Sequence, residues 1–260
     1  MTTFLMQWLC LHKKYLLWNL VSRNLKVKYR KSTLGFLWTL LVPGALAATY
    51  YFVFRIVLKV EIPNYVAFVV SGILPWTFVS QSIAESTDCI VNNFGLLSKV
   101  PIPIQIFPLS GVLTNFINLI LATPVLIVVI MLSDISFHWS YLAIIPIFIA
   151  LFVIAYSFSL LFSVAYVFFR DLKHIINIGL QIWFYATPVL YSVNLIPEQY
   201  RWGLYVNPVG AAFAELHGIL ISNHSLALSN WIAILTWTLL SASLSLLVLW
   251  KTRDSVVENI

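Results

Sequence analysis

Two long stretches of this sequence carry no charged residue, at positions 104–133 and 141–169. Each is longer than the about 20 apolar residues that a helix needs to cross the hydrocarbon core of a bilayer. The whole chain is 61% hydrophobic and 9% charged, whereas a soluble domain is about 45–50% apolar and about 25% charged. These values exclude a soluble enzyme, a disordered chain and a small disulfide-linked scaffold. We therefore expect an all-α polytopic membrane protein, because a helix satisfies its own backbone hydrogen bonds in lipid.

Apolar segments of sufficient length predict six membrane spans in this chain of 260 residues. The predicted spans cover residues 34–58, 65–84, 104–132, 141–168, 175–191 and 231–250. Residues 194–229 are ambiguous, because Asn207-Pro208 and Glu215 interrupt the apolar run 204–221. Interrupted helices are tolerated at membrane depth where protein shields them. We predict one or two short re-entrant helices there, on the outer face, and a complete crossing by residues 204–221 stays open.

The N-terminal segment, residues 1–33, is predicted to lie at the membrane surface and to precede a permease domain of residues 34–260. Lys13 and Lys14 interrupt its apolar run, so it cannot form a span. Its large apolar residues recur at steps of three or four, which is the spacing of one face of an amphipathic helix. They are Phe4, Trp8, Leu11, Tyr15 and Trp18. The helix is either a simple anchor or a moving part of a gate.

Basic residues are concentrated before the first predicted span. Seven of the 15 Lys and Arg residues lie between Lys13 and Lys31, and the formal net charge is +6. Basic residues beside a first span favour the cytoplasmic side and its anionic lipids, so this charge indicates a membrane anchor rather than a surface for nucleic acid. With both termini in the cytoplasm, twelve Lys and Arg lie inside and three lie outside. This orientation agrees with the positive-inside rule.

The sequence contains no motif for catalysis, metal binding or nucleotide hydrolysis. It has no phosphate-binding G-x-x-x-x-G-K-[ST] loop, no H-E-x-x-H and no G-x-S-x-G. Cys10 and Cys89 are too few for a thiolate site. The centres of the predicted spans hold no acidic residue or histidine, although ion-coupled transporters usually place such groups there. We expect a permease that is not an enzyme, binds no metal or cofactor and depends on a separate subunit for ATP hydrolysis.

Aromatic residues make up 15% of the chain, with 10 Trp, 12 Tyr and 18 Phe. Most are expected to pack between helices or to face lipid, and some mark the membrane interfaces. Aromatic rings also offer uncharged platforms on which a sugar ring can stack. The candidates for a carbohydrate path are Trp38, Tyr51, Phe54, Trp183 and Tyr185.

Several segments, in chain order, resemble the permeases of polysaccharide ABC exporters. They are residues 23–43 at the entry to the first span, 97–108 before the third, 168–172 after the fourth, 186–191 at the end of the fifth, and Asn207-Pro208. The resemblance implies a half-transporter that forms a homodimer and docks two separate ATPase subunits, which bind ATP and Mg²⁺. It implies a channel between the two copies, formed chiefly by the first and fifth spans.

The substrate class that the resemblance implies is lipid-linked surface polysaccharide, carried on polyprenyl pyrophosphate across the bacterial inner membrane. O-antigen is the expected cargo. Capsule, teichoic acid and small lipids or drugs are the alternatives within related exporters. A membrane-embedded glycosyl- or acyltransferase is a further alternative, although the sequence lacks the buried acid and base groups that it would need.

Site residues follow from the resemblance by position. A helix that couples to the ATPase is expected around Glu85, Asp88, Asn92 and Asn93. The second cytoplasmic contact is expected at Arg170 and Asp171. The lipid headgroup would enter beside Lys26, Lys28 and Arg30, for which the alternative role is the membrane anchor.

Overall fold

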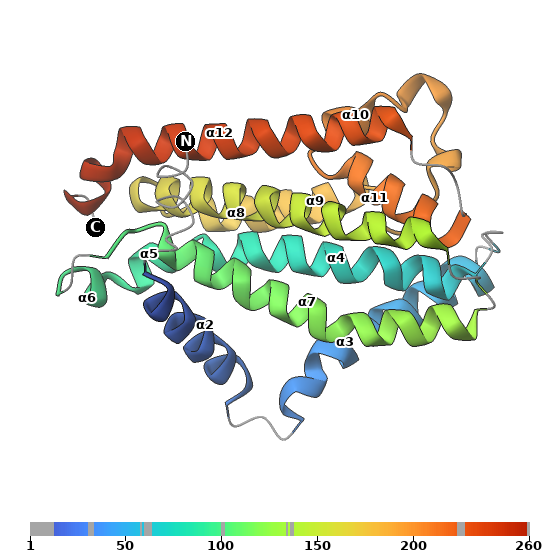
Figure 1. Cartoon of the computed structure of the whole chain (residues 1–260), viewed down its shortest axis with the longest axis horizontal. Coiled ribbons are helices and arrows are strands. Elements are labelled where there is room, and N and C mark those ends of the chain that lie inside the picture. Colours follow the sequence, from blue (N-terminus) through green and yellow to red (C-terminus); the bar gives the residue numbers. More distant parts are fainter. Residues whose placement is uncertain are drawn as a thin grey trace.

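The computed structural model describes residues 13–30, 34–57, 59, 64–99, 102–133, 135, 138–222 and 227–258. Within these ranges every regular element is a helix, and the long helices run side by side along one axis (Figure 1). One end of the bundle carries the short helices α5 and α6, and we call it the α5 end. The opposite end carries α11 and is called the α11 end.

The bounds of the described helices are as follows, in chain order. The α-helices are α2 Lys14–Tyr29, α3 Trp38–Tyr50, α4 Tyr65–Ser86, α5 Cys89–Asn92, α6 Phe94–Leu97, α7 Ile106–Leu132, α8 Ile144–Phe168, α9 Leu172–Ala186, α10 Gly203–Val206, α11 Gly210–His217 and α12 Leu228–Glu258. A π-helical segment, Tyr51–Val57, continues α3. A second one, Gly218–Ser222, continues α11.

Five of the described helical segments are long and apolar enough to cross a membrane. They are Leu40–Val57, Tyr65–Ser86, Ile106–Leu132, Trp139–Phe168 and Leu228–Thr252. These segments overlap five of the six predicted spans, and the prediction of an all-α polytopic membrane protein is confirmed.

Helix α9 differs from the predicted fifth span, because it ends at Ala186 rather than continuing to residue 191. Pro188 disfavours helical geometry in the residue before it, and Thr187 is accordingly extended, with φ −104° and ψ 138°. The 15 residues of α9 span about 22 Å, less than the about 30 Å of a hydrocarbon core. The crossing of the bilayer by α9 therefore stays a prediction.

The chain bends sharply where the sequence predicts an interruption. The segments Glu198–Val206 and Gly210–Ile221 meet at 112°, with Asn207-Pro208 in the break. This bend agrees with the predicted pair of short helices. A sixth crossing by the bent pair stays open.

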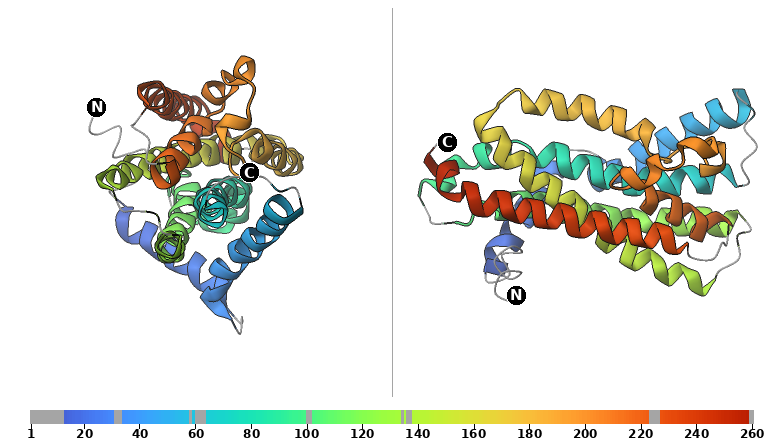
Figure 2. Two further views of the ribbon diagram at one scale, coloured as in Figure 1. Left: turned by 90° about the vertical axis from the view of Figure 1, so that its right-hand side faces the viewer. Right: turned by 90° about the horizontal axis from the view of Figure 1, so that it is seen from above.

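Helix α4 lies at the centre of the bundle and contacts α3, α7, α8, α9 and α11 (Figure 2, left). Lipid is as apolar as the helices themselves, so small residues and hydrogen bonds must hold membrane helices together. At the α5 end, the Ser159 hydroxyl of α8 donates to the Ser82 carbonyl of α4 at 3.0 Å. At the α11 end, Gly72 lets the carbonyl of Val189 and the imidazole of His217 approach the backbone of α4.

Helices α2 and α3 form a V on one side of the bundle (Figure 1). Helix α2 buries Leu17, Leu20 and Val21, whereas Tyr15 and Trp18 are exposed. The two exposed rings belong to the predicted apolar stripe, and the rest of that stripe lies outside the described residues. The face that α2 turns to the bundle is therefore a different one from the stripe.

We predict that Gly72→Ala destabilises the folded protein. An added Cβ would clash with the carbonyl oxygen of Val189, so backbone must move, and such overpacking costs about 1–3 kcal/mol. The measurement is the melting temperature of the purified protein in detergent. Gly44→Ala is the control, because its Cβ would meet nothing within 4 Å. Equal melting temperatures for the two variants would contradict this packing.

Candidate functional site

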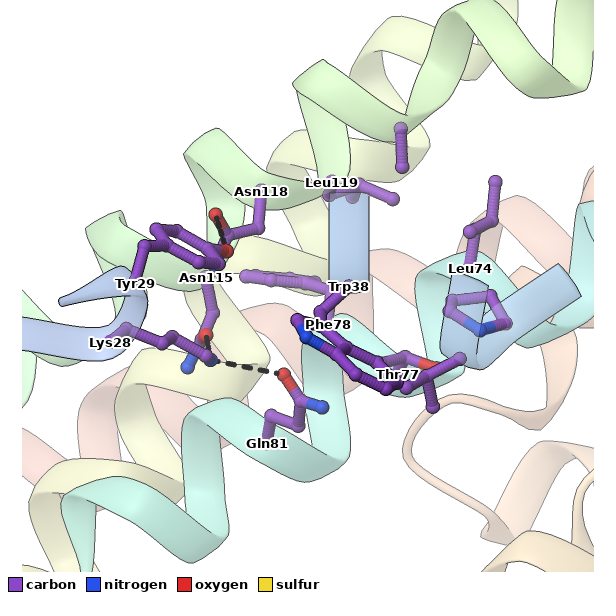
Figure 3. A pocket seen from close by; sticks show the side chains of 13 residues that line it. Lys28, Tyr29, Trp38, Leu74, Thr77, Phe78, Gln81, Asn115, Asn118 and Leu119 are labelled. Carbon is purple, nitrogen blue, oxygen red and sulfur yellow. Dashed lines mark hydrogen bonds between the residues drawn. The ribbon is translucent and has the colours of Figure 1, made fainter. Parts of the chain in front are cut away.

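A polar cluster joins α2, α4 and α7 towards the α5 end. The ammonium of Lys28 donates to Glu85 Oε1 at 3.0 Å and to Asn115 Oδ1 at 3.1 Å. Asn115 Nδ2 in turn donates to Glu85 Oε2 at 2.9 Å. Lys28 also donates to Gln81 at 3.4 Å (Figure 3). The first helix of the described chain is thus fixed to the end of the central helix.

Two further contacts tie α5 to distant parts of the chain. The Arg23 guanidinium of α2 donates to Asn93 Oδ1 at 2.9 Å, just after α5. Asp88, just before α5, forms a hydrogen-bonded ion pair with Lys173 in the first turn of α9. The Asp88 carboxylate is mostly buried, at 17% exposure. The predicted coupling segment therefore contacts both α2 and α9.

The remaining predicted coupling residues are exposed. Asn92 and Asp171 are exposed, and Asp171 immediately precedes α9. Arg170 is exposed and its guanidinium carbon lies 5.3 Å from the centre of the Tyr166 ring, a cation–π distance. Arg170 and Asp171 thus form a projecting turn between α8 and α9.

Three polar residues of this end were not among the sequence predictions. Lys173 and Arg23 pair with the predicted residues Asp88 and Asn93. Asn115 completes the Lys28–Glu85 cluster. A polar amide inside the apolar third span was a usable signal for Asn115, because such groups need partners at membrane depth.

Cys89 follows Asp88 and is a packing residue. Burial, with a smaller contribution from the Asp88 carboxylate, raises the pKa of the Cys89 thiol well above its usual value. The thiol therefore stays protonated at neutral pH, and a reactive thiolate is not formed.

The basic residues predicted beside the membrane surface divide into two kinds. Lys28 is held by Glu85 and Asn115 as described above. Lys26 on α2 and Arg30, which directly follows α2, are exposed. Their two predicted roles, headgroup binding and anchoring, remain predictions.

The five candidate aromatics occupy different environments. Trp183 is half-buried, packs edge-on against Trp76 at 5.9 Å and donates its indole N–H to Asn207 Oδ1 at 2.7 Å. Phe54 is half-buried and packs between Tyr50 and Tyr65. The other three are exposed, namely Trp38, Tyr51 and Tyr185. Trp183 and Phe54 thus have packing partners, and the exposed ring of Tyr185 also packs edge-on against Phe184 at 5.2 Å.

A groove of about 440 Å³ opens between α3, α4 and α9. Its aromatic lining includes Tyr50, Trp76, Phe184 and Tyr185. Its polar lining consists of Thr77, Ser80, Gln81 and Gln181. Rings and uncharged hydrogen-bonding groups therefore line the same surface, which is the chemistry that a sugar chain requires.

Hydrogen bonds also hold the region around the 112° bend. Asn207 accepts from Trp183 and donates to the Thr187 hydroxyl at 2.9 Å, so it joins the bend to the end of α9. Glu215 of α11 is buried and accepts from Asn230 Nδ2 of α12 at 2.8 Å. His217 is buried and its ring stacks on Phe68 of α4, with centroids 3.9 Å apart.

Comparison with known proteins identifies the family. Residues 15–221 match the ABC-2 type transporter family. The chain belongs to this family. As an ABC-2 permease it is a multi-pass protein of the inner membrane and works with an ATPase subunit.

Its relatives include named polysaccharide transport proteins. The chain is 33% identical to the O-antigen export system permease protein RfbA of Klebsiella pneumoniae over 194 residues, 74% of each chain. It is 38% identical to the RfbA protein of Myxococcus xanthus over 186 residues, 71% of each chain. It is 22% identical to the polysialic acid transport protein KpsM of Escherichia coli over 246 residues, which cover 92% of this chain and 93% of the relative.

We predict that charge reversal at one end of the Asp88–Lys173 pair destabilises this ABC-2 permease and that the double reversal restores it. Asp88→Lys places two ammonium groups together, whereas Asp88→Lys with Lys173→Asp recreates the attraction. A pair this close to solvent contributes about 0.2–1 kcal/mol. The melting temperatures of Asp88→Lys, Lys173→Asp and the double variant are compared with that of the unmodified chain in a double-mutant cycle.

Lys99→Asp is the matched control, because it makes a charge reversal at an exposed lysine of the same end. If the double variant melts at the same temperature as the less stable single variant, the pair does not join α5 to α9.

Proposed function

We propose that this chain is the membrane subunit of an ATP-driven exporter of surface polysaccharide, with O-antigen as its cargo. The polysaccharide would be linked to polyprenyl pyrophosphate, and two copies of the chain would work with two ATPase subunits. The similarity to O-antigen export permeases, over about three quarters of the chain, carries this proposal.

The exposed surfaces of α3 and α9 support a path between two copies. In α9 only Ile176 and Leu180 are buried. Two amide side chains, Asn177 and Gln181, are exposed on this helix. Amides in hydrocarbon cost several kcal/mol when they lack partners. A partner chain and a hydrated glycan would satisfy them, and the groove between α3, α4 and α9 adds aromatic rings to the same side.

The α5 end suits the ATPase contact. Helix α5 and the projecting α8–α9 turn lie at this end, joined by the Asp88–Lys173 pair. A displacement of either segment would therefore be transmitted to α9. The ion pair between Glu85 and Lys28 would transmit it to α2. We place this end and both termini in the cytoplasm, in agreement with the twelve basic residues on that side of the predicted topology.

Export of a capsular polysaccharide is the second candidate. The similarity to the polysialic acid transport protein favours it, because that match covers nearly the full length of both chains. The lower identity, 22% against 33–38%, ranks it below O-antigen.

Deletion of the gene in its own bacterium tests the proposed function. We expect loss of long-chain polysaccharide from the cell surface and accumulation of its lipid-linked form inside. Immunoblots of surface glycan and mass spectrometry of the lipid fraction measure the two effects. Loss of capsule with unchanged O-antigen would select the second candidate. Unchanged amounts of both polysaccharides would reject polysaccharide export.

Arg170→Ala tests the proposed ATPase contact. Arg170 is exposed and its guanidinium contacts the ring of Tyr166. We therefore expect the variant to fold normally. Export and ATPase activity of the purified complex should fall together, because the α8–α9 turn would no longer engage the ATPase. Arg201→Ala, at the α11 end, is the control and should retain both activities. Normal export by the Arg170 variant would show that this turn does not couple.

A further inference from the structure

A pocket of about 370 Å³ lies inside the V of α2 and α3 and is closed behind by α4 and α7. It adjoins the groove between α3, α4 and α9, since Val42, Thr77 and Gln81 line both. Figure 3 shows Lys28, Tyr29, Asn115 and Asn118 gathered on one side of this pocket and Leu74 on the other.

The pocket changes from polar to apolar along the bundle axis. On α4 its lining runs from Gln81 to Leu74, and on α7 from Asn115 to Ala122. Both steps are seven residues, or about 10 Å of helix. Because the polar groups lie nearer the α5 end, an amphiphile would place its headgroup there and its chain towards the middle of the bilayer.

One residue of the pocket wall, Asn118, carries a buried donor without a partner among the described residues. Asn118 is 8% exposed, and its Oδ1 accepts from the Tyr29 hydroxyl at 3.0 Å. Its amide Nδ2 has no hydrogen-bond partner within the described part of the chain. A buried amide hydrogen without an acceptor is unfavourable, because it has lost the hydrogen bond that it makes in water. A ligand oxygen, such as that of an ester or phosphate, would remove this cost.

The charges beside the pocket are balanced. Lys28 and Glu85 lie 3.0 Å apart, and both are partly exposed, at 28% and 47% of their side chains. Lys28 lines the pocket, and Glu85, its ion-pair partner, lies next to that lining, so a headgroup at Lys28 is close to one positive and one negative group. A pyrophosphate, with several negative charges and no positive one, would meet the Glu85 carboxylate as well as Lys28. A headgroup with one charge of each sign is complementary to both.

We propose that this pocket binds one zwitterionic glycerophospholipid of the adjoining leaflet, with its phosphate towards Lys28 and its ammonium towards Glu85. An ester or phosphate oxygen accepts from Asn118, and an acyl chain lies against Pro43, Leu74 and Ala122. The lipid fills the V and supports the position of α2. This site adjoins the proposed glycan path, and lipid binding there does not depend on the proposed function.

Native mass spectrometry of the purified full-length chain tests the proposal. The protein is delipidated in mild detergent and offered phosphatidylethanolamine, phosphatidylglycerol or undecaprenyl pyrophosphate. We expect one retained phosphatidylethanolamine and weaker retention of the two anionic lipids. Stronger retention of either anionic lipid, or no retained phosphatidylethanolamine, would overturn the proposal.

Two variants locate the bound lipid. Ala122→Trp fills the apolar end and should abolish retention, whereas Leu121→Trp, at an exposed neighbour, should leave it unchanged. Asn118→Leu keeps the volume and removes the donor, so retention should fall about fivefold, which corresponds to one hydrogen bond of about 1 kcal/mol. It also provides the test if Ala122→Trp does not fold. Equal retention by Asn118→Leu and the unmodified chain would place the lipid elsewhere.

Discussion

The hydrocarbon core of the bilayer offers no partner to a polar group and no hydrophobic drive between helices. The arrangement around α4 follows from this constraint. Its neighbours approach closely where a glycine or serine replaces a bulky side chain, as at Gly72 and Ser82. Polar side chains also pair across helices, as Glu85 does with Asn115 towards the α5 end. Close packing and such pairs therefore supply cohesion that the hydrophobic effect supplies in a soluble domain.

Polar contacts between side chains have different structural roles at the two ends of the bundle. At the α5 end, charged pairs join segments that are far apart in sequence, and these pairs lie close enough to solvent to rearrange. At the α11 end, Asn207 and Glu215 hold the bent pair by partly buried bonds to Trp183 and Asn230. The contacts at the α5 end are thus suited to rearrangement, whereas those at the α11 end keep a fixed shape.

Apolar length predicts six spans, and five of them overlap described helices that are long and apolar enough to cross a membrane. Pro188, which restricts Thr187, was a readable signal for the end of α9 at Ala186, before the end of the predicted span at residue 191. The pairing of Asp88 with Lys173 was not, because 85 residues separate them and local pattern carries no record of distant contacts. The contact between Lys28 and Glu85 could not be predicted for the same reason. The sequence alone assigns Lys28 to the membrane surface and Glu85 to the contact with the ATPase.

The shortness of α9 has a consequence for the membrane itself. A helix of about 22 Å is several ångströms shorter than an ordinary hydrocarbon core, and such hydrophobic mismatch is relieved by thinning of the bilayer. With α9 spanning the bilayer as predicted, the two leaflets would draw together beside it. A polar headgroup that crossed along this helix would then travel a shorter distance through hydrocarbon, and its barrier would be lower before any conformational change.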